Sequence, residues 1–245
     1  MRGRDVIEPA MRADSKLASP TARVDSKLAS PMARVDQPEV VLAALVLAHG
    51  AGAPMDSPFM EAIAAGLCAC GIRVVRFEFP YMAARRRTQK RSPPDRMPVL
   101  EASFRAVIGS QPSDVPLFIG GKSMGGRVAT MLVDAADLRG SLAGAVALGY
   151  PFHPPGRADT LRIEHLRACS ARCLIVQGTR DTFGTEPEVA SYGLPTNVRV
   201  HWIADGDHSL EPRKASGRTS AQNLAEAIDV AAQFMLQKPG RKRRD

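Results

Sequence analysis

A serine flanked by glycines follows an apolar stretch near the middle of the chain. Residues 121–125 read Gly-Lys-Ser-Met-Gly and come directly after the run Val115–Gly120. This G-x-S-x-G spacing is typical of a sharp strand-to-helix turn that exposes a serine hydroxyl, because small flanking residues let strand and helix close around it. A helix N-terminus after the turn favours developing negative charge. The pattern predicts Ser123 as a nucleophile. The alternative is a glycine-rich turn in which the serine has no chemical role.

The same turn also resembles the end of a phosphate-binding loop. The triplet 121–123 reads Gly-Lys-Ser and could close the pattern G-x-x-x-x-G-K-[ST]. The first glycine of that pattern would fall at position 116, which is Pro116 and offers a phosphate no backbone N–H. Residues 117–119 are also apolar, as in a strand. The sequence therefore argues against nucleotide binding at this turn.

An acid and a base follow two later apolar runs in the order that this serine motif requires. Asp181 comes shortly after Cys173–Gln177, and His208 comes after Val198–Ala204. The other four histidines precede the acid or lie inside an expected helix or strand. We therefore expect Ser123, Asp181 and His208 to form a nucleophile–base–acid relay. Two further carboxylates, at positions 205 and 207, are too close in sequence to the histidine to act as the acid, and we expect them to shape its loop.

Small residues after the first long apolar run could bind an oxyanion. Val40–Ala48 is followed by His-Gly-Ala-Gly at 49–52. In sites of this type an oxyanion is held by the N–H after the nucleophile and by one from an early strand–helix loop. These would be the N–H groups of Met124 and Ala51, and a plain glycine turn is the alternative. We expect His49 to support this loop rather than to ionise.

Apolar and amphipathic segments alternate between these positions. The expected strands are Val40–Ala48, Ile72–Phe79, Val115–Gly120, Gly144–Gly149, Cys173–Gln177 and Val198–Ala204. The expected helices are Ser57–Cys70, Pro98–Ile108, Met124–Ala136, Arg157–Leu166, Glu186–Tyr192 and Ala221–Leu236. Continuous apolar strands alternating with helices predict a doubly wound, mostly parallel α/β sheet. In such a sheet the residues at the carboxyl ends of the strands carry the chemistry.

At this point the chain resembles the α/β-hydrolase superfamily. The segments that carry the resemblance are HGAGAPMDSPFM at 49–60, RFEFPYM at 76–82, GGKSMGGR at 120–127, QGTRD at 177–181 and GDHS at 206–209. In detail it looks like the small dienelactone-hydrolase-like branch, which includes a testis-expressed hydrolase-like protein and a subunit of the nonspecific-lethal chromatin complex. The resemblance spans nearly all of 40–236. It implies a serine-hydrolase fold and an esterase-like activity, with serine where dienelactone hydrolases proper have cysteine.

The expected reaction is hydrolysis of a carboxylic ester or thioester of a small molecule through an acyl-enzyme, with no metal or organic cofactor. The alternative is a non-catalytic interaction protein that retains the hydrolase fold. The short connection at 150–158 leaves no room for a large lid domain. Lys122 and Arg127 flank the nucleophile, and we expect them to pair with nearby carboxylates; substrate contact is the alternative.

The net charge of +8 is concentrated in two tails and one loop. Between residues 81 and 98 there are six basic side chains and one acidic side chain. Because this loop follows a strand at its carboxyl end, Arg85, Arg86 and Arg87 could border the site and bind anionic substrates. A solvated loop is the alternative. Since the excess charge lies outside the expected core, nucleic-acid binding is not expected.

The two ends of the chain have the composition of appendages. Residues 1–37 hold two copies of an eleven-residue repeat and no aromatic side chain, so we expect a disordered, dispensable leader. Residues 238–245 form a basic tail, which leaves 38–237 as one hydrolase domain. The sequence shows no apolar signal segment and no membrane span. The four cysteines lack the spacing of common zinc sites, so we expect buried thiols and a cytoplasmic location.

Overall fold

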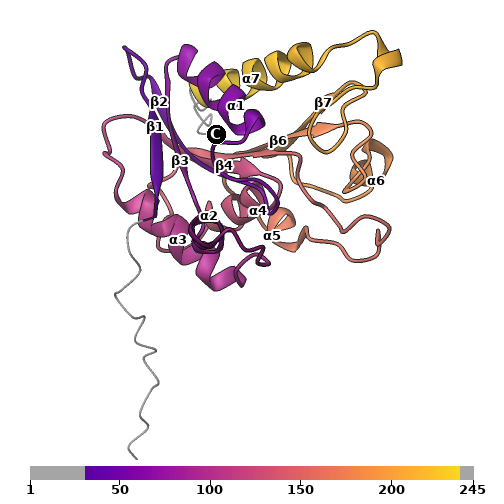
Figure 1. Ribbon diagram of the computed structural model, residues 1–245. Helices are drawn as coiled ribbons and strands as arrows, with labels where there is room; N and C mark the ends of the chain where they lie inside the picture. The colour runs from indigo at the N-terminus through magenta and orange to yellow at the C-terminus, as the bar shows by residue number, and fades with distance from the viewer. Residues whose placement is uncertain (1–30, 238–245) are drawn as a thin grey trace, which may run out of the picture.

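The computed structural model describes residues 31–237, which contain a seven-stranded sheet (Figure 1). The strand order is β1-β3-β2-β4-β5-β6-β7, and all neighbours are parallel except β1 and β3. The strands are β1 Ala33–Asp36, β2 Ala43–Ala48, β3 Ile72–Phe77, β4 Leu117–Lys122, β5 Gly144–Leu148, β6 Cys173–Gly178 and β7 Val198–Ile203. The expected doubly wound, mostly parallel α/β architecture is confirmed.

Helices cover both faces of the sheet (Figure 1). One face is covered by α1 Pro58–Ala69 and α7 Ser220–Leu236. The opposite face carries α2 Pro80–Thr88, α3 Met97–Gly109, α4 Met124–Leu132, α5 Glu164–Arg167 and α6 Glu186–Ala190, and a short 3₁₀ helix, η1 Lys214–Ser216, precedes α7. In the described part of the chain, no helix is long and apolar enough to cross a membrane.

The two-sided covering explains why β2 and β5 are apolar at every position. In β2, Val46 and Ala48 join the core on one face, while Leu45 and Leu47 join the core on the other. Successive side chains of a strand point to opposite faces, so a strand buried on both sides has no polar position. The register then aligns the ends of the strands: Ala48 lies opposite Gly121 of β4. The loops that follow β2 and β4 therefore start side by side.

Two connections differ from expectation. The first half of the basic segment 81–98 is not a loop but helix α2, with Tyr81 and Met82 as its buried residues. In the sequence, the three adjacent arginines make this segment look like a polar loop, because only two neighbouring residues form its apolar contact with the core. The helix expected over 157–166 is reduced to the four-residue α5. The connection from β5 to β6 therefore contains no large lid domain, as expected.

The boundary of the expected leader is wrong at its C-terminal end. Residues 33–36 form β1, which pairs antiparallel with β3 at the edge of the sheet. Asp36 accepts two hydrogen bonds from Arg76, at 2.9 and 3.0 Å, and Arg76 is buried, with a side chain only 7% exposed. The side chains of β1 are mostly exposed, so the strand has no run of apolar residues by which it could be predicted. The ion pair between Asp36 and Arg76 helps to hold it against the sheet. Residues 1–30 and 238–245, which include the rest of the leader and the basic tail, lie outside the described residues.

We predict that a chain starting at Pro38 is less stable than one starting at Pro31. Losing Asp36 leaves the buried Arg76 guanidinium without its carboxylate. Removing one partner of a buried ion pair costs about 3–5 kcal/mol, and the partial exposure of Asp36 lowers this to about 2 kcal/mol. For a domain of this size the melting temperature should fall by about 4–8 °C. Thermal unfolding of the two chains measures this difference, and the longer chain with Asp36→Asn shows how much of it comes from the ion pair. Equal melting temperatures for the two chains would contradict the prediction.

Candidate active site

Ser123 occupies a strained turn between β4 and α4. Its backbone angles are φ 51° and ψ −112°, a region that non-glycine residues rarely adopt. The two flanking glycines make the turn possible: a Cβ on Gly121 would lie 2.5 Å from the carbonyl carbon of Gly125, and one on Gly125 would lie 2.6 Å from the Ala48 oxygen. Strain of this kind persists only where the surrounding structure holds it. The turn presents the serine hydroxyl at the carboxyl edge of the sheet.

The structure brings Ser123, Asp181 and His208 together. The His208 Nε2 lies 2.9 Å from the Ser123 Oγ, and the His208 Nδ1 lies 2.8 Å from the Asp181 Oδ2. Because an ionised carboxylate only accepts hydrogen bonds, Nδ1 carries the proton and Nε2 is left to accept from the hydroxyl. The three side chains come from the ends of β4, β6 and β7, 85 residues apart between serine and histidine. This arrangement can activate a serine for nucleophilic attack.

Gln177, the next-to-last residue of β6, orients the acid, and sequence reasoning missed it. Its Nε2 donates to the Asp181 Oδ2 at 2.8 Å, and its Oε1 accepts from the N–H of Tyr150 at 2.6 Å. The N–H of Phe183 donates to the other Asp181 oxygen at 2.9 Å. Gln177 and Asp181 are both fully buried. The sequence did contain one indication of this role, because a glutamine near the end of an otherwise apolar strand is unusual.

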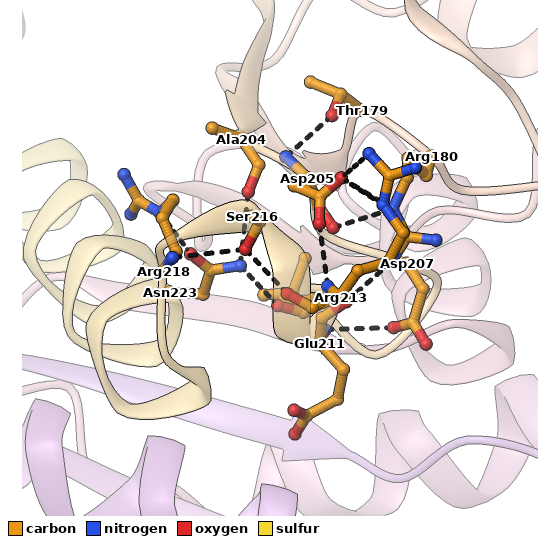
Figure 2. Close-up of polar contacts among 11 residues, drawn as sticks. Thr179, Arg180, Ala204, Asp205, Asp207, Glu211, Arg213, Ser216, Arg218 and Asn223 are labelled. Carbon is orange, nitrogen blue, oxygen red and sulfur yellow. Dashed lines mark hydrogen bonds and ion pairs between the residues drawn. The ribbon is translucent and has the colours of Figure 1, made fainter.

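A polar network around Asp205 and Asp207 holds the loop that carries His208 (Figure 2). Asp205 accepts from Arg180 and Arg213, and its N–H donates to the Thr179 hydroxyl at 2.9 Å. Asp207 accepts from the N–H groups of residues 209 and 211. The Arg213 hydrogen bond lowers the pKa of the Asp205 carboxyl. The expectation that both aspartates shape this loop is confirmed.

An aromatic ring and a helix also contact this loop. The ring of Phe183 stacks on the imidazole of His208 with 4.1 Å between centroids. Asn223, near the start of α7, donates to the carbonyl of Leu210 at 2.7 Å. His208 and its loop are therefore held by the Asp205 network, by the ring of Phe183 and by Asn223 of α7.

The Ala51 and Met124 N–H groups, the two candidates for an oxyanion site, belong to the loop after β2 and to the first residue of α4. Ala51 lines the same pocket as Ser123, and Met124 begins α4 directly after it. Within residues 31–237 neither N–H donates to a protein acceptor. The pocket has a volume of about 360 Å³ and mostly small or apolar walls, among them Phe59, Met60 and Phe183.

His49 holds the loop beside this pocket. Its Nε2 accepts from the N–H of Phe79 at 3.1 Å, so its Nδ1 carries the proton and donates to the Gly50 oxygen at 2.7 Å. The side chain is fully buried, and burial lowers the pKa of the imidazole. A neutral histidine that joins the ends of β2 and β3 matches the expected supporting role.

The three arginines of α2 lie outside the pocket around Ser123. Arg86 donates to Glu78 and to Asp56 at 2.7 Å, and its hydrogen bond with Glu78 raises the pKa of the guanidinium. Arg85 and Arg87 do not line the pocket either. In the segment that could attract anionic substrates, Arg86 instead pairs with Glu78, just after β3, and with Asp56, just before α1.

The expected carboxylate partners of Lys122 and Arg127 are not found within residues 31–237. Lys122 donates to the carbonyl of His208, and the Nε of Arg127 is buried with no hydrogen-bond partner in the same part of the chain. The cysteines are free thiols; Cys169 and Cys173 are buried, whereas Cys68 and Cys70 are half-buried. Among the described residues no group of three or more His, Cys, Asp or Glu could hold a metal ion.

We predict that Gln177→Met slows catalysis without removing any of the three reacting side chains. The Asp181 carboxylate loses one of its donors, and the N–H of Tyr150 is left buried without an acceptor. An unsatisfied buried group costs about 1–3 kcal/mol of stability, and a base misplaced by about 1 Å can cost up to about 100-fold in rate. Ester hydrolysis and thermal unfolding of the variant test both effects; wild-type rates would contradict the role of Gln177. Asn197→Ala removes a half-buried amide that donates to the carbonyls of Cys169 and Ala171, away from Asp181, and is the control for the loss of an amide.

Comparison with known proteins identifies the family of this chain and proteins that share its fold. A family model described as Alpha/beta hydrolase domain matches residues 41–236. A lidless α/β serine hydrolase from Xanthomonas campestris, XC6422, is 18% identical, with a TM-score of 0.61 over 84% of this chain and 90% of that chain. A dienelactone hydrolase from Anabaena variabilis is also 18% identical, with a TM-score of 0.60 over 82% and 89%.

Est1E from Butyrivibrio proteoclasticus, solved with ferulic acid bound, is 15% identical, with a TM-score of 0.64 over 85% of this chain and 96% of that chain. At these identities the structural neighbours show a shared fold. Because the family model matches most of the chain, the protein belongs to the α/β-hydrolase domain family.

Proposed function

We propose that this protein is a serine hydrolase that cleaves a carboxylic ester or thioester through an acyl-enzyme. The observation that carries the proposal is the hydrogen-bond chain from Asp181 through His208 to Ser123. The strained backbone of Ser123 supports the same chemistry, as do the N–H groups of Ala51 and Met124, which have no acceptor within residues 31–237. Structural neighbours described as serine hydrolases and esterases add fold-level support.

In the proposed first half-reaction, the Ser123 oxygen attacks the carbonyl carbon while the His208 Nε2 takes the hydroxyl proton. The carbonyl oxygen becomes an oxyanion, which accepts from the N–H groups of Ala51 and Met124. When the intermediate collapses, the bond to the leaving alcohol or thiol breaks, and His208 returns its proton to that group. Asp181 stabilises the imidazolium that forms between the two steps.

In the second half-reaction a water molecule attacks the acyl-enzyme. His208 takes one proton from the water, the same two N–H groups hold the second oxyanion, and collapse releases the carboxylic acid and regenerates the Ser123 hydroxyl. The apolar pocket walls formed by Phe59, Met60 and Phe183 would receive the acyl or alkyl substituent. The volume of about 360 Å³ is enough for a small acyl or alkyl substituent.

We further propose that the chain belongs to the small dienelactone-hydrolase-like branch of its family, on the segments at 49–52 and 121–127. We also propose a cytoplasmic location. Four free thiols, two of them buried, suit a reducing compartment.

We predict graded losses when the three reacting side chains are replaced. Ser123→Ala and His208→Ala should each lower kcat for p-nitrophenyl acetate by up to about 10⁶-fold, because the nucleophile or its base is removed. Asp181→Asn should lower it by about 10⁴-fold, since the histidine loses its orienting partner. Ser141→Ala, on an exposed serine of another loop, is the control and should hydrolyse the ester at the wild-type rate.

The wild type itself decides between this proposal and a non-catalytic interaction protein. Hydrolysis that survives Ser123→Ala would show that another residue reacts. A folded wild type that hydrolyses no ester from a panel of varied chain length would favour the interaction protein.

A further inference from the structure

Lys122 joins the nucleophile turn to the loop that carries the base. It directly precedes Ser123, and its Nζ donates to the main-chain carbonyl of His208. Ser123 holds the imidazole of the same histidine through its Nε2 at 2.9 Å. Two consecutive residues of the elbow therefore bind one residue of the base loop, one at its side chain and the other at its main chain.

Lys122 is half-buried at the wall of the pocket, and its ammonium forms no ion pair within residues 31–237. The stem of the side chain packs near Gly50, and its Nζ lies 5.6 Å from the centre of the Phe59 ring. Burial lowers the pKa of this amine to about 8, although Asp181 and Asp207, which face it from the neighbouring loops, favour its charged form. A charge that is partly removed from water without an ion pair carries a desolvation cost. A methionine of similar length would avoid that cost, so packing alone does not account for a lysine here.

The backbone beyond β5 leaves room for this contact. Gly149 has φ +64°, and a Cβ at this position would lie 2.5 Å from the His208 oxygen and 2.7 Å from the Lys122 Nζ. A side chain here would thus collide with both partners of the hydrogen bond. The glycine allows the lysine and the histidine carbonyl to meet beneath the imidazole.

No other hydrogen bond holds the His208 main chain at this carbonyl in the described part of the chain. The imidazole is guided by Asp181, by Ser123 and by the ring of Phe183, which all act on the side chain. During turnover the hydrogen bond between His208 and Ser123 breaks and re-forms. A main-chain anchor that does not exchange its proton keeps the histidine in place while this happens.

We propose that Lys122 is a positioning residue for the base, whose ammonium anchors the His208 carbonyl and keeps the imidazole within reach of the Ser123 hydroxyl throughout the reaction. The inference rests on the proposed hydrolase function and adds a dependence of its rate on the protonation of Lys122. Deprotonating Nζ turns a charge-assisted hydrogen bond into a neutral one of about half the strength. The anchor is thus at full strength below pH 8 and weakens as the pH rises through that value, so kcat should fall there.

The test compares the wild type with Lys122→Met in hydrolysis of p-nitrophenyl acetate between pH 6 and 10. At pH 7 the variant should lose about 10- to 100-fold in kcat, the scale of a misplaced catalytic group, with an almost unchanged KM. The wild-type kcat should fall above pH 8, and the variant should lack this fall. Lys90→Met, on an exposed lysine beyond α2, should match the wild type at every pH.

A second variant tests the ammonium itself. Lys122→Cys, alkylated with 2-bromoethylamine, forms a carbon–sulfur bond with loss of bromide and restores an amine of lysine-like length. Activity should return, because the anchor returns. The wild type treated with the same reagent controls for alkylation of the four native cysteines.

The outcomes separate this proposal from the proposed function. A Lys122→Met variant with wild-type kcat and the wild-type fall above pH 8 overturns the anchor and leaves the hydrolase intact. Should the variant not fold, the wild-type profile decides, since a kcat that stays level from pH 7 to 10 also overturns the anchor. A wild type without esterase activity overturns the proposed function instead.

Discussion

The positive φ angle of Ser123 is the constraint on which the site depends. A serine at φ 51° is held only if strand β4 and helix α4 approach closely on both sides of it. Gly121 and Gly125 permit that approach, because a Cβ at either position would overlap main-chain atoms. The register between β2 and β4 then brings the Ala51 loop beside the turn. The backbone strain, the accessible hydroxyl and the candidate oxyanion site all result from the close approach of β4 and α4 at this turn.

His208 and Asp181 are positioned differently, by a layered set of hydrogen bonds. Three N–H donors surround the buried Asp181 carboxylate: the imidazole, the Gln177 amide and the main chain of Phe183. Outside them, Asp205 and its arginines fix the ends of the base loop. The strained turn alone would place a hydroxyl without a proton acceptor. The layered network supplies the acceptor at 2.9 Å.

The sequence was sufficient for the parallel sheet and for the residues that meet at its edge. Continuous apolar strands and the order of Ser123, Asp181 and His208 carry that information locally. Contacts between distant segments do not appear in local patterns. The edge strand β1 has exposed side chains and is held by Asp36 and Arg76, and α2 looks like a basic loop because its anchor is only two residues long. Gln177 was missed because its role depends on side-chain contacts with Asp181 and with the main chain of Tyr150, which no local pattern of apolar residues shows.

The central claim is that Ser123 is a nucleophile activated by His208, and a covalent adduct tests it most directly. The wild type is incubated with a fluorophosphonate, and peptide mass spectrometry locates the phosphonyl group. The account predicts one adduct per chain, on the peptide that contains Ser123, and none on the Ser123→Ala or His208→Ala variants within the same time. An adduct on another residue, or a folded wild type that remains unlabelled, would contradict the account.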